Sequence, residues 1–204
     1  TDQLTGLFNR RKLEHDLTLH HESYLRHSAP TSILMFDLDN LKKINDSKGH
    51  HAGDQLLREA AQRLSQCVGD AGMVARLSGD EFVVVLSDVA NAAGALRSAD
   101  RLLESMHGAF TLNQQLVTMS PSIGISLYPD DGDTGDALLR NADAAMYHAK
   151  ESGRGNYQRY QLGMEDRAME VLQQERLLRE AIANNAVMLH YQPQMNLADG
   201  RLQG

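Results

Sequence analysis

The sequence has little of several features that would place it in particular protein classes. It contains one cysteine, Cys67, so it cannot form an internal disulfide, which suits a reducing cytoplasm. Its longest strongly apolar run, 82–86, is far shorter than the ~20 residues that a membrane helix needs, and no signal peptide is recognisable. The net charge of −7 disfavours non-specific binding to DNA or RNA. These absences predict a cytoplasmic chain with no nucleic-acid partner and no direct membrane contact.

Length and composition bound the organisation of the chain. At about 100–200 residues per domain, its 204 residues correspond to one domain and part of a second. Hydrophobic residues make up 42% and charged residues 23%, which is typical of a folded protein. Because the chain begins at Thr1 inside what reads as a structured segment, we expect it to be a piece of a longer protein, which upstream segments could anchor in a membrane.

The spacing of apolar residues predicts alternating helices and strands. Asn9 and Asp54 are well placed to cap the first and third helices. Helices are predicted near 10–24, 40–46, 55–64, 91–107, 134–150 and 164–184. Strands are predicted near 33–36, 73–77, 82–86, 116–128, 157–160 and 188–191.

The central elements follow the split βαβ, ferredoxin-like order. In that topology the third strand lies between the first two and runs antiparallel to both, so the turn before it lies beside the end of the first strand. Asp37 and Asp39 are therefore expected close to Asp80 and Glu81. Such carboxylates repel one another unless cations or protons intervene, which predicts a metal site.

Short motifs follow one another along the chain in an order typical of one family. They are 2–10 (DQLTGLFNR), 36–39 (FDLD), 44–46 (IND), 49–50 (GH), 53–54 (GD), 76–82 (RLSGDEF), 122–125 (SIGI), 142–147 (ADAAMY), 149–150 (AK) and 153–154 (GR). Together they resemble the GGDEF domain of diguanylate cyclases over residues 1–162. The resemblance implies a palm-type α/β (α+β) domain, with a mostly antiparallel sheet flanked by helices. It also implies a homodimer that condenses two GTP molecules into cyclic di-GMP and releases pyrophosphate.

The resemblance assigns the acidic residues to metal binding and catalysis. Asp37, the Leu38 carbonyl and Asp80 match the metal ligands, and Glu81 matches a further ligand or the general base. Two Mg²⁺ (or Mn²⁺) ions per site would activate the 3′-hydroxyl and neutralise the leaving pyrophosphate. The alternative is a turn that is acidic because it is solvated. Asp39 either caps the helix at Asn40 or supports the site without holding the metal.

Other residues match the family's substrate contacts. Asn45 and Asp54, with His50 nearby, match guanine-reading residues. A carboxylate can accept from guanine's N1–H and amine while an Asn amide donates to its ring acceptors, and adenine lacks this pattern. An Asx turn at 45–46 and a helix cap at Asp54 are the alternatives. Lys150 and Arg154 match residues that hold the triphosphate, with Lys42 as a third candidate; a basic helix end that complements the helix dipole is the alternative. Gly79 is expected at positive φ or where the backbone approaches the nucleotide.

Two departures from the family pattern bear on activity. Ser78 replaces the first glycine of the signature, which favours a second hypothesis: a catalytically weak GTP-binding module that regulates an attached phosphodiesterase. Gly69 and Gly72 stand where the family has the Arg and Asp of an inhibitory product site, so we predict no feedback inhibition through that site.

The last part of the chain, 163–204, reads as a C-terminal helical extension followed by a second domain's beginning. Residues 189–194 (LHYQPQ) and 199–201 (DGR) resemble the opening of an EAL phosphodiesterase domain. We expect this truncated start to be unable to hydrolyse cyclic di-GMP, although an attached EAL domain in a longer parent protein could.

Overall fold

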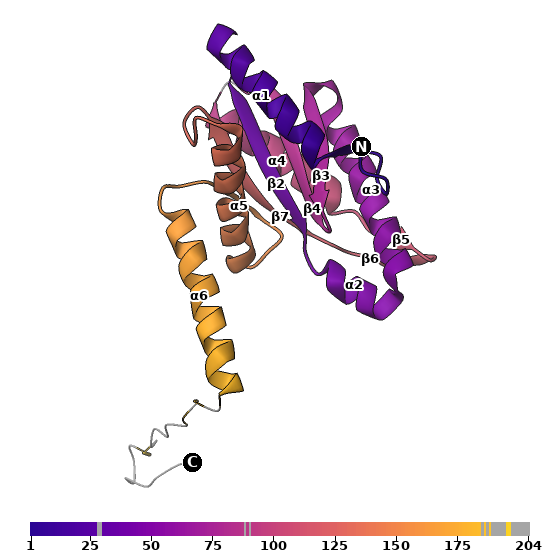
Figure 1. The fold of residues 1–204 in the computed structure, drawn as a ribbon. Coiled ribbons are helices and arrows are strands. Elements are labelled where there is room, and N and C mark those ends of the chain that lie inside the picture. The colour runs from indigo at the N-terminus through magenta and orange to yellow at the C-terminus, as the bar shows by residue number, and fades with distance from the viewer. Residues whose placement is uncertain are drawn as a thin grey trace. The chain divides into compact units, whose positions relative to one another are not determined.

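The computed structural model describes residues 1–27, 30–87, 89, 91–184, 186, 188, 195 and 196. It contains a six-stranded sheet of order β1-β3-β4-β2-β7-β8 and a separate hairpin of β5 and β6, which are labelled in Figure 1. The elements are β1 (Phe8–Asn9), α1 (Arg10–His27), β2 (Thr31–Leu38), α2 (Leu41–Lys48), α3 (His50–Val68), a 3-10 turn (Gly69–Ala71), β3 (Gly72–Ser78), β4 (Glu81–Ser87), α4 (Ala92–Met106), β5 (Phe110–Leu112), β6 (Gln115–Val117), β7 (Pro121–Tyr128), α5 (Gly135–Glu151), β8 (Tyr157–Arg159) and α6 (Met164–Ala183).

The ferredoxin-like prediction for the sheet is confirmed. Strand β4 lies between β2 and β3 and is antiparallel to both, and β7 is antiparallel to β2 on its other side. Only the outer pairs, β1 with β3 and β7 with β8, are parallel. The turn between β3 and β4 therefore lies at the end of β2, as the order of the elements predicts.

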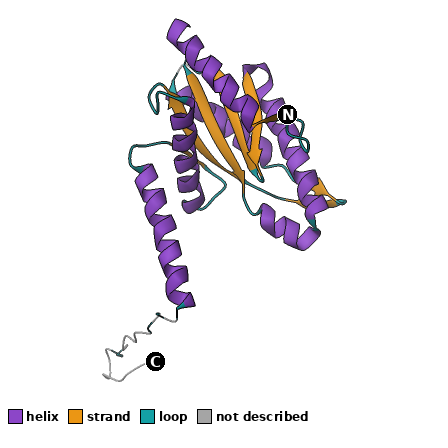
Figure 2. Cartoon of the chain, in the orientation of Figure 1, coloured by secondary structure: helices purple, strands orange, loops and turns teal. Residues whose placement is uncertain are grey.

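Helices cover both faces of the sheet (Figure 2). Because neighbouring strand residues point to opposite faces, Leu34 and Phe36 of β2 pack with α3 and α4, whereas Ile33 and Met35 pack with α1 and α5. The second face brings α5, which carries Lys150, directly against the central strands.

Most predicted helix starts agree with the structure, whereas the cap predicted at Asp54 and the capping alternative for Asp39 do not. The Asn9 side chain accepts a hydrogen bond from the Lys12 amide at 3.1 Å and so caps α1. Asp54 does not cap α3, which begins at His50, because Gly49 at φ +84° provides the turn one helical turn earlier. Asp39 does not cap α2 either: Asn40 occupies that position in the left-handed region without a side-chain bond.

The extended stretch predicted at 116–128 consists of two separate strands, β6 and β7, which are divided just before Pro121. β6 pairs with β5, and β7 begins at Pro121, whose ring nitrogen cannot donate to a strand ladder and is tolerated at a first strand position. Most of the strand predicted at 188–191, and the segments 189–194 and 199–201, lie outside the described residues.

Contacts divide the chain into two compact units, 1–168 and 169–204. The domain boundary predicted after residue 162 stays a prediction. Within the part of the chain that is described, no helix has the length and apolar character to cross a bilayer.

Candidate functional site

Carboxylates from two distant segments meet at the end of β2. Asp37 is the cross-strand partner of Glu81, and the Leu38 amide donates to the Asp80 carbonyl at 3.3 Å. Asp80 sits in the two-residue turn between β3 and β4, where Gly79 has a φ of +44°. The hairpin thus delivers Asp80 and Glu81 to Asp37, the juxtaposition that the strand order predicts.

Basic residues from the end of α5 reach the same edge. The Lys150 ammonium lies 2.8 Å from Asp37 Oδ2, and Arg154 Nε lies 3.8 Å from Asp39 Oδ1. α5 packs along β7 and β2, so its C-terminal turn lies at the end of β2. Both predicted phosphate-binding residues are therefore paired with aspartates of the β2 end.

Partial burial, together with the close approach of several carboxylates, raises the pKa values of Asp80 and Asp143. Partial burial raises the pKa of Asp80, and the charges of Asp37 and Glu81 raise it further, whereas Lys150 opposes the shift. Partial desolvation also raises the pKa of Asp143, although its side chain is exposed, and the charge of Glu81 adds to this. Asp143 was missed as a site residue by sequence reasoning. Its position in α5, seven residues before Lys150 and hence on the same helix face, was the available signal.

Asp39 is a buried anchor for the surrounding loops. Its carboxylate accepts hydrogen bonds from the hydroxyls of Ser120 (3.1 Å) and Ser122 (2.8 Å) and from the Gly155 amide (3.1 Å). Asp39 is only 4% exposed, and Arg154 forms an ion pair with its carboxylate. Asp39 therefore connects β2, β7 and the loop after α5, and these donors account for a carboxylate buried beside the acidic edge.

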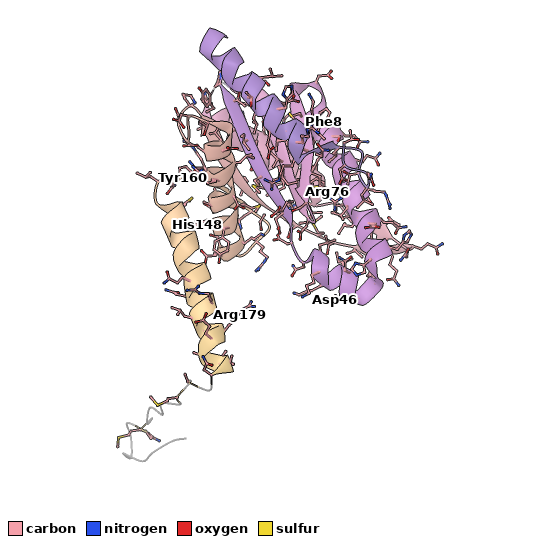
Figure 3. All side chains as sticks on the ribbon, viewed as in Figure 1. Phe8, Asp46, Arg76, His148, Tyr160 and Arg179 are labelled. Atoms are coloured by element: carbon pink, nitrogen blue, oxygen red, sulfur yellow. The ribbon has the colours of Figure 1, made fainter. Side chains whose placement is uncertain are left out.

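A second set of contacts connects the N-terminal segment to the turn between β3 and β4. Arg76, which is labelled on the ribbon in Figure 3, donates from Nε and Nη2 to the Gly79 carbonyl at 3.0 and 2.6 Å. Its Nη1 lies 3.1 Å from Asp2 Oδ1, which also accepts from the Thr5 amide and hydroxyl. The motif at 2–10 is thereby linked to the turn that carries Asp80.

The Asp2→Asn variant tests this link through stability. Burial raises the pKa of Asp2, but hydrogen bonds from Thr5 and Arg76 outweigh burial and lower it below its ordinary value of 3.8. The ionised carboxylate thus stabilises the fold at higher pH, and this contribution is lost as the pH falls below 3.8 through the folded-state pKa. We expect Asp2→Asn to cost about 1 kcal/mol of unfolding free energy at about pH 7, and less at about pH 3.

Urea denaturation across this pH range measures the difference, with Asp70→Asn, an exposed aspartate, as the control. An Asp2→Asn penalty that is the same at both pH values would contradict the assignment.

Ser78 makes a direct contact with the candidate base. It is the last residue of β3, the cross-strand partner of Glu81, and its hydroxyl donates to Glu81 Oε2 at 2.8 Å. Its φ is not among the positive values of the chain, so a side chain fits at this position without backbone strain. Serine in place of glycine therefore adds a restraint on Glu81 and leaves the turn, formed by Gly79, intact.

The predicted guanine contacts lie on the helix pair that follows β2. Asn45 is on α2 and Asp54 on α3, and a Cβ on Gly53 would lie 1.9 Å from Asn45 Oδ1. That oxygen is buried and has no hydrogen-bond partner, whereas Asp54 is half-buried. Lys42 and His50 are exposed on the same two helices. A carboxylate and an amide oxygen are the kinds of acceptor that guanine's N1–H and amine groups require as partners.

The residues at the predicted product site have structural roles. Gly69, at φ +52°, ends α3. A Cβ on Gly72 would lie 2.0 Å from the Val85 carbonyl oxygen in the neighbouring strand, so this backbone admits no side chain there.

The donor set at the β2 end fits a hard cation that shares its coordination with a ligand. Among the residues that the structure describes, no group of three His, Cys, Asp or Glu side chains is arranged to hold a metal ion alone. Mg²⁺ usually takes one or two carboxylates together with water and substrate phosphates. Asp37, Asp80 and the Leu38 carbonyl supply this kind of oxygen set, and Lys150 and Arg154 beside them suit phosphates.

Comparison with known proteins places this arrangement in a family. Residues 1–156 match the family described as "Diguanylate cyclase, GGDEF domain". The chain is 39% identical over 203 residues to the bifunctional diguanylate cyclase/cyclic di-GMP phosphodiesterase MucR of Pseudomonas aeruginosa, covering 100% of this chain and 30% of MucR. It is 38% identical over 201 residues to the cyclic di-GMP phosphodiesterase NbdA of the same species, covering 98% of this chain and 26% of NbdA.

A solved structure agrees. The GGDEF domain of TpbB (YfiN) from Pseudomonas aeruginosa superposes with a TM-score of 0.79 at 40% identity, covering 83% of this chain and 98% of that one. The chain spans about a quarter to a third of the length of the curated full-length relatives that it matches along its whole length. By its matched residues and its fold, the chain belongs to the GGDEF domain family of diguanylate cyclases.

Proposed function

We propose that this domain is a diguanylate cyclase that condenses two GTP molecules into cyclic di-GMP and releases pyrophosphate. The observation that carries the proposal is the meeting of Asp37, Asp80 and Glu81 at the end of β2, with Lys150 beside them. Curated relatives that carry the cyclase name support it. We further propose that the domain acts in the cytoplasm.

The reaction is a nucleotidyl transfer, and the acidic edge suits its charge changes. The 3′-hydroxyl of one GTP attacks the α-phosphorus of the other; an O3′–P bond forms, the bond to the β-phosphate oxygen breaks, and the hydroxyl proton must be accepted. We assign the proton to Glu81, whose carboxylate Ser78 restrains at 2.8 Å, or else Glu81 completes the metal ligands. Asp37, Asp80 and the Leu38 carbonyl would hold Mg²⁺ or Mn²⁺, two ions per site. When bound, these ions lower the pKa of the attacking hydroxyl and neutralise charge on the leaving pyrophosphate.

The substrate contacts follow from the same residues. Lys150 and Lys42 would bind the triphosphate through their ammonium groups, and Arg154 would bind it through its planar guanidinium group. Asn45 and Asp54, with His50 near them, would read the guanine edge. Adenine would leave the carboxylate and the buried Asn45 oxygen unpaired, which costs affinity.

Each domain would hold one GTP, so two copies must face each other to close the ring. The test is pyrophosphate release and cyclic di-GMP formation by the purified chain with GTP and Mg²⁺ over a range of protein concentrations. We expect activity to rise more steeply than linearly with protein concentration. GTP that binds saturably but yields no pyrophosphate at any concentration would contradict cyclase activity and favour the regulatory function below. We also expect no inhibition by product through residues 69 and 72, where Gly72 excludes a side chain.

A regulatory role in a longer protein is the second candidate. The similarity to NbdA, whose name is that of a phosphodiesterase, extends over 98% of the chain and past the family match that ends at residue 156. We therefore propose that 163–204 is a linker helix and the start of an EAL domain in a longer parent. GTP-dependent changes in the parent's cyclic di-GMP hydrolysis, without GTP turnover, would support this role.

The Gly53→Ala variant separates the guanine contact from stability. The added Cβ would occupy the place of the Asn45 amide, 1.9 Å from its oxygen, and this side-chain end can rotate away at little cost to the fold. Alanine is also the better helix former by about 1 kcal/mol. We expect the KM for GTP to rise about tenfold, with a melting temperature equal to or above that of the wild type.

Asn45→Ala is the matched control for Gly53→Ala. Both changes remove the same contact, so the double variant should bind GTP no more weakly than either single variant. A Gly53→Ala enzyme with unchanged GTP affinity would show that Asn45 does not contact the base.

A further inference from the structure

The Lys150 ammonium lies next to the Asp37 carboxylate, close to where a divalent cation bound to Asp37 would lie. Its ammonium is 2.8 Å from Asp37 Oδ2, and the two side chains are 27% and 14% exposed. The pair is thus partly shielded from solvent, so it is screened less than a surface ion pair. Asp37 therefore has a positive partner in Lys150.

A metal ion and this ammonium compete for one carboxylate. Two cations on the same carboxylate repel each other, more strongly where water is partly excluded. Asp37 becomes a good metal ligand only when Lys150 has another anion to pair with.

The triphosphate of a bound nucleotide is the anion that can pair with Lys150 in place of Asp37. Lys150 is in the last turn of α5, and Arg154 follows it in the loop, where its Nε pairs with Asp39. Breaking the Lys150–Asp37 pair and breaking the Arg154–Asp39 pair have different effects on the two aspartates. Asp39 already accepts three hydrogen bonds and does not depend on Arg154 alone, whereas moving Lys150 leaves Asp37 without its cation.

We propose that Lys150 is an exchangeable counter-ion that couples nucleotide binding to metal binding: it neutralises Asp37 in the free protein, and moves to the triphosphate when nucleotide binds, which frees Asp37 for the metal. This inference rests on the proposed function. Because coupling between two ligands is reciprocal, the metal strengthens nucleotide binding by the same factor. The free domain consequently binds divalent cations weakly, and the metal site is completed only when the nucleotide binds.

Mn²⁺ binding to the 204-residue chain, followed by electron paramagnetic resonance, tests the exchange without turnover. Lys150→Met is expected to bind Mn²⁺ in the absence of nucleotide about fivefold to tenfold more tightly than wild type, because the competing cation is gone. A GTP analogue with a methylene between the α- and β-phosphates, which cannot release pyrophosphate, should tighten Mn²⁺ binding to the wild type. It should do so much less for Lys150→Met. Lys150→Arg, which keeps the charge, should retain most of the wild-type coupling.

Lys12→Met is the matched control, since it removes a lysine paired with an aspartate (Asp16, 2.6 Å) on α1 and should leave Mn²⁺ affinity unchanged. Circular dichroism establishes that each variant is folded, and Lys150→Gln replaces Lys150→Met if the latter is not. Mn²⁺ affinity of the folded Lys150 variant equal to that of the wild type would overturn the exchange while leaving the proposed function standing. Failure of the wild type to bind Mn²⁺ even with the analogue would instead overturn the proposed function.

Discussion

Replacing Asp80 by asparagine is expected to reduce cyclic di-GMP formation by about a thousandfold or more, while the protein remains folded and as stable as the wild type or more so. The loss follows from the removal of a carboxylate that we propose as a metal ligand. The retained stability follows from the environment of Asp80. Burial and the charges of Asp37 and Glu81 raise its pKa, so above that pKa the ionised side chain costs folding free energy, and asparagine removes this cost.

Pyrophosphate release and thermal unfolding, measured on the same preparation at neutral pH, check both halves of this prediction. Asp46→Asn removes an exposed carboxylate from α2, labelled in Figure 3, and is the matched control, expected to change neither quantity. If Asp80→Asn kept a tenth of the wild-type activity, Asp80 would not be a metal ligand. A large fall in melting temperature would show that Asp80 has a structural role instead.

Gly124→Ala is the second prediction with a large effect, and it acts on the fold. A Cβ at this position of β7 would lie 1.9 Å from the Ala142 carbonyl oxygen and 2.3 Å from the Met146 amide nitrogen. Both are backbone atoms of α5, so no side-chain rotation relieves the overlap, and the helix must move away from the sheet. We expect a loss of about 2–4 kcal/mol of unfolding free energy.

Activity should fall with Gly124→Ala as well, even where the protein is still folded, because α5 carries Lys150 to Asp37. Urea denaturation measures the first effect and cyclic di-GMP formation the second. Gly94→Ala is the control: it lies in the first turn of α4, and its nearest neighbours are side-chain atoms of Val89, Arg97 and Asn91, so we expect a change near zero. A Gly124→Ala protein with wild-type stability would mean that α5 is less closely packed on β7 than the structure has it.

The sequence predicts the acidic edge correctly because strand order alone determines which ends meet. Once 73–86 is identified as a hairpin, the ferredoxin-like order places its turn beside Asp37, whatever the loops between them do. Motif resemblance then supplies the family and the candidate residues, whose roles stay proposals.

Other features depend on contacts that local patterns do not encode. For Asp39 the sequence left two roles open, a helix cap or support of the site, because its acceptor bonds come from Ser120, Ser122 and Gly155, which are far away in the chain. The Lys150–Asp37 pair and the influence of Glu81 on Asp143 likewise arise between elements. The start of α3 was misplaced because glycine at positive φ can begin a helix without a capping side chain.

The anchoring of Asp39 has a mechanical consequence for how substrate enters. One carboxylate fastens the end of β2, the start of β7 and the loop bearing Arg154, so this side of the site forms a stiff wall. Helix α3 is anchored too, because Arg63 donates to the carbonyls of Gly108 at 2.8 Å and Ala109 at 2.7 Å, which leaves the short helix α2 as the less firmly held part of the opposite side. We therefore expect the base to arrive and depart past α2, with the phosphates held against the stationary side.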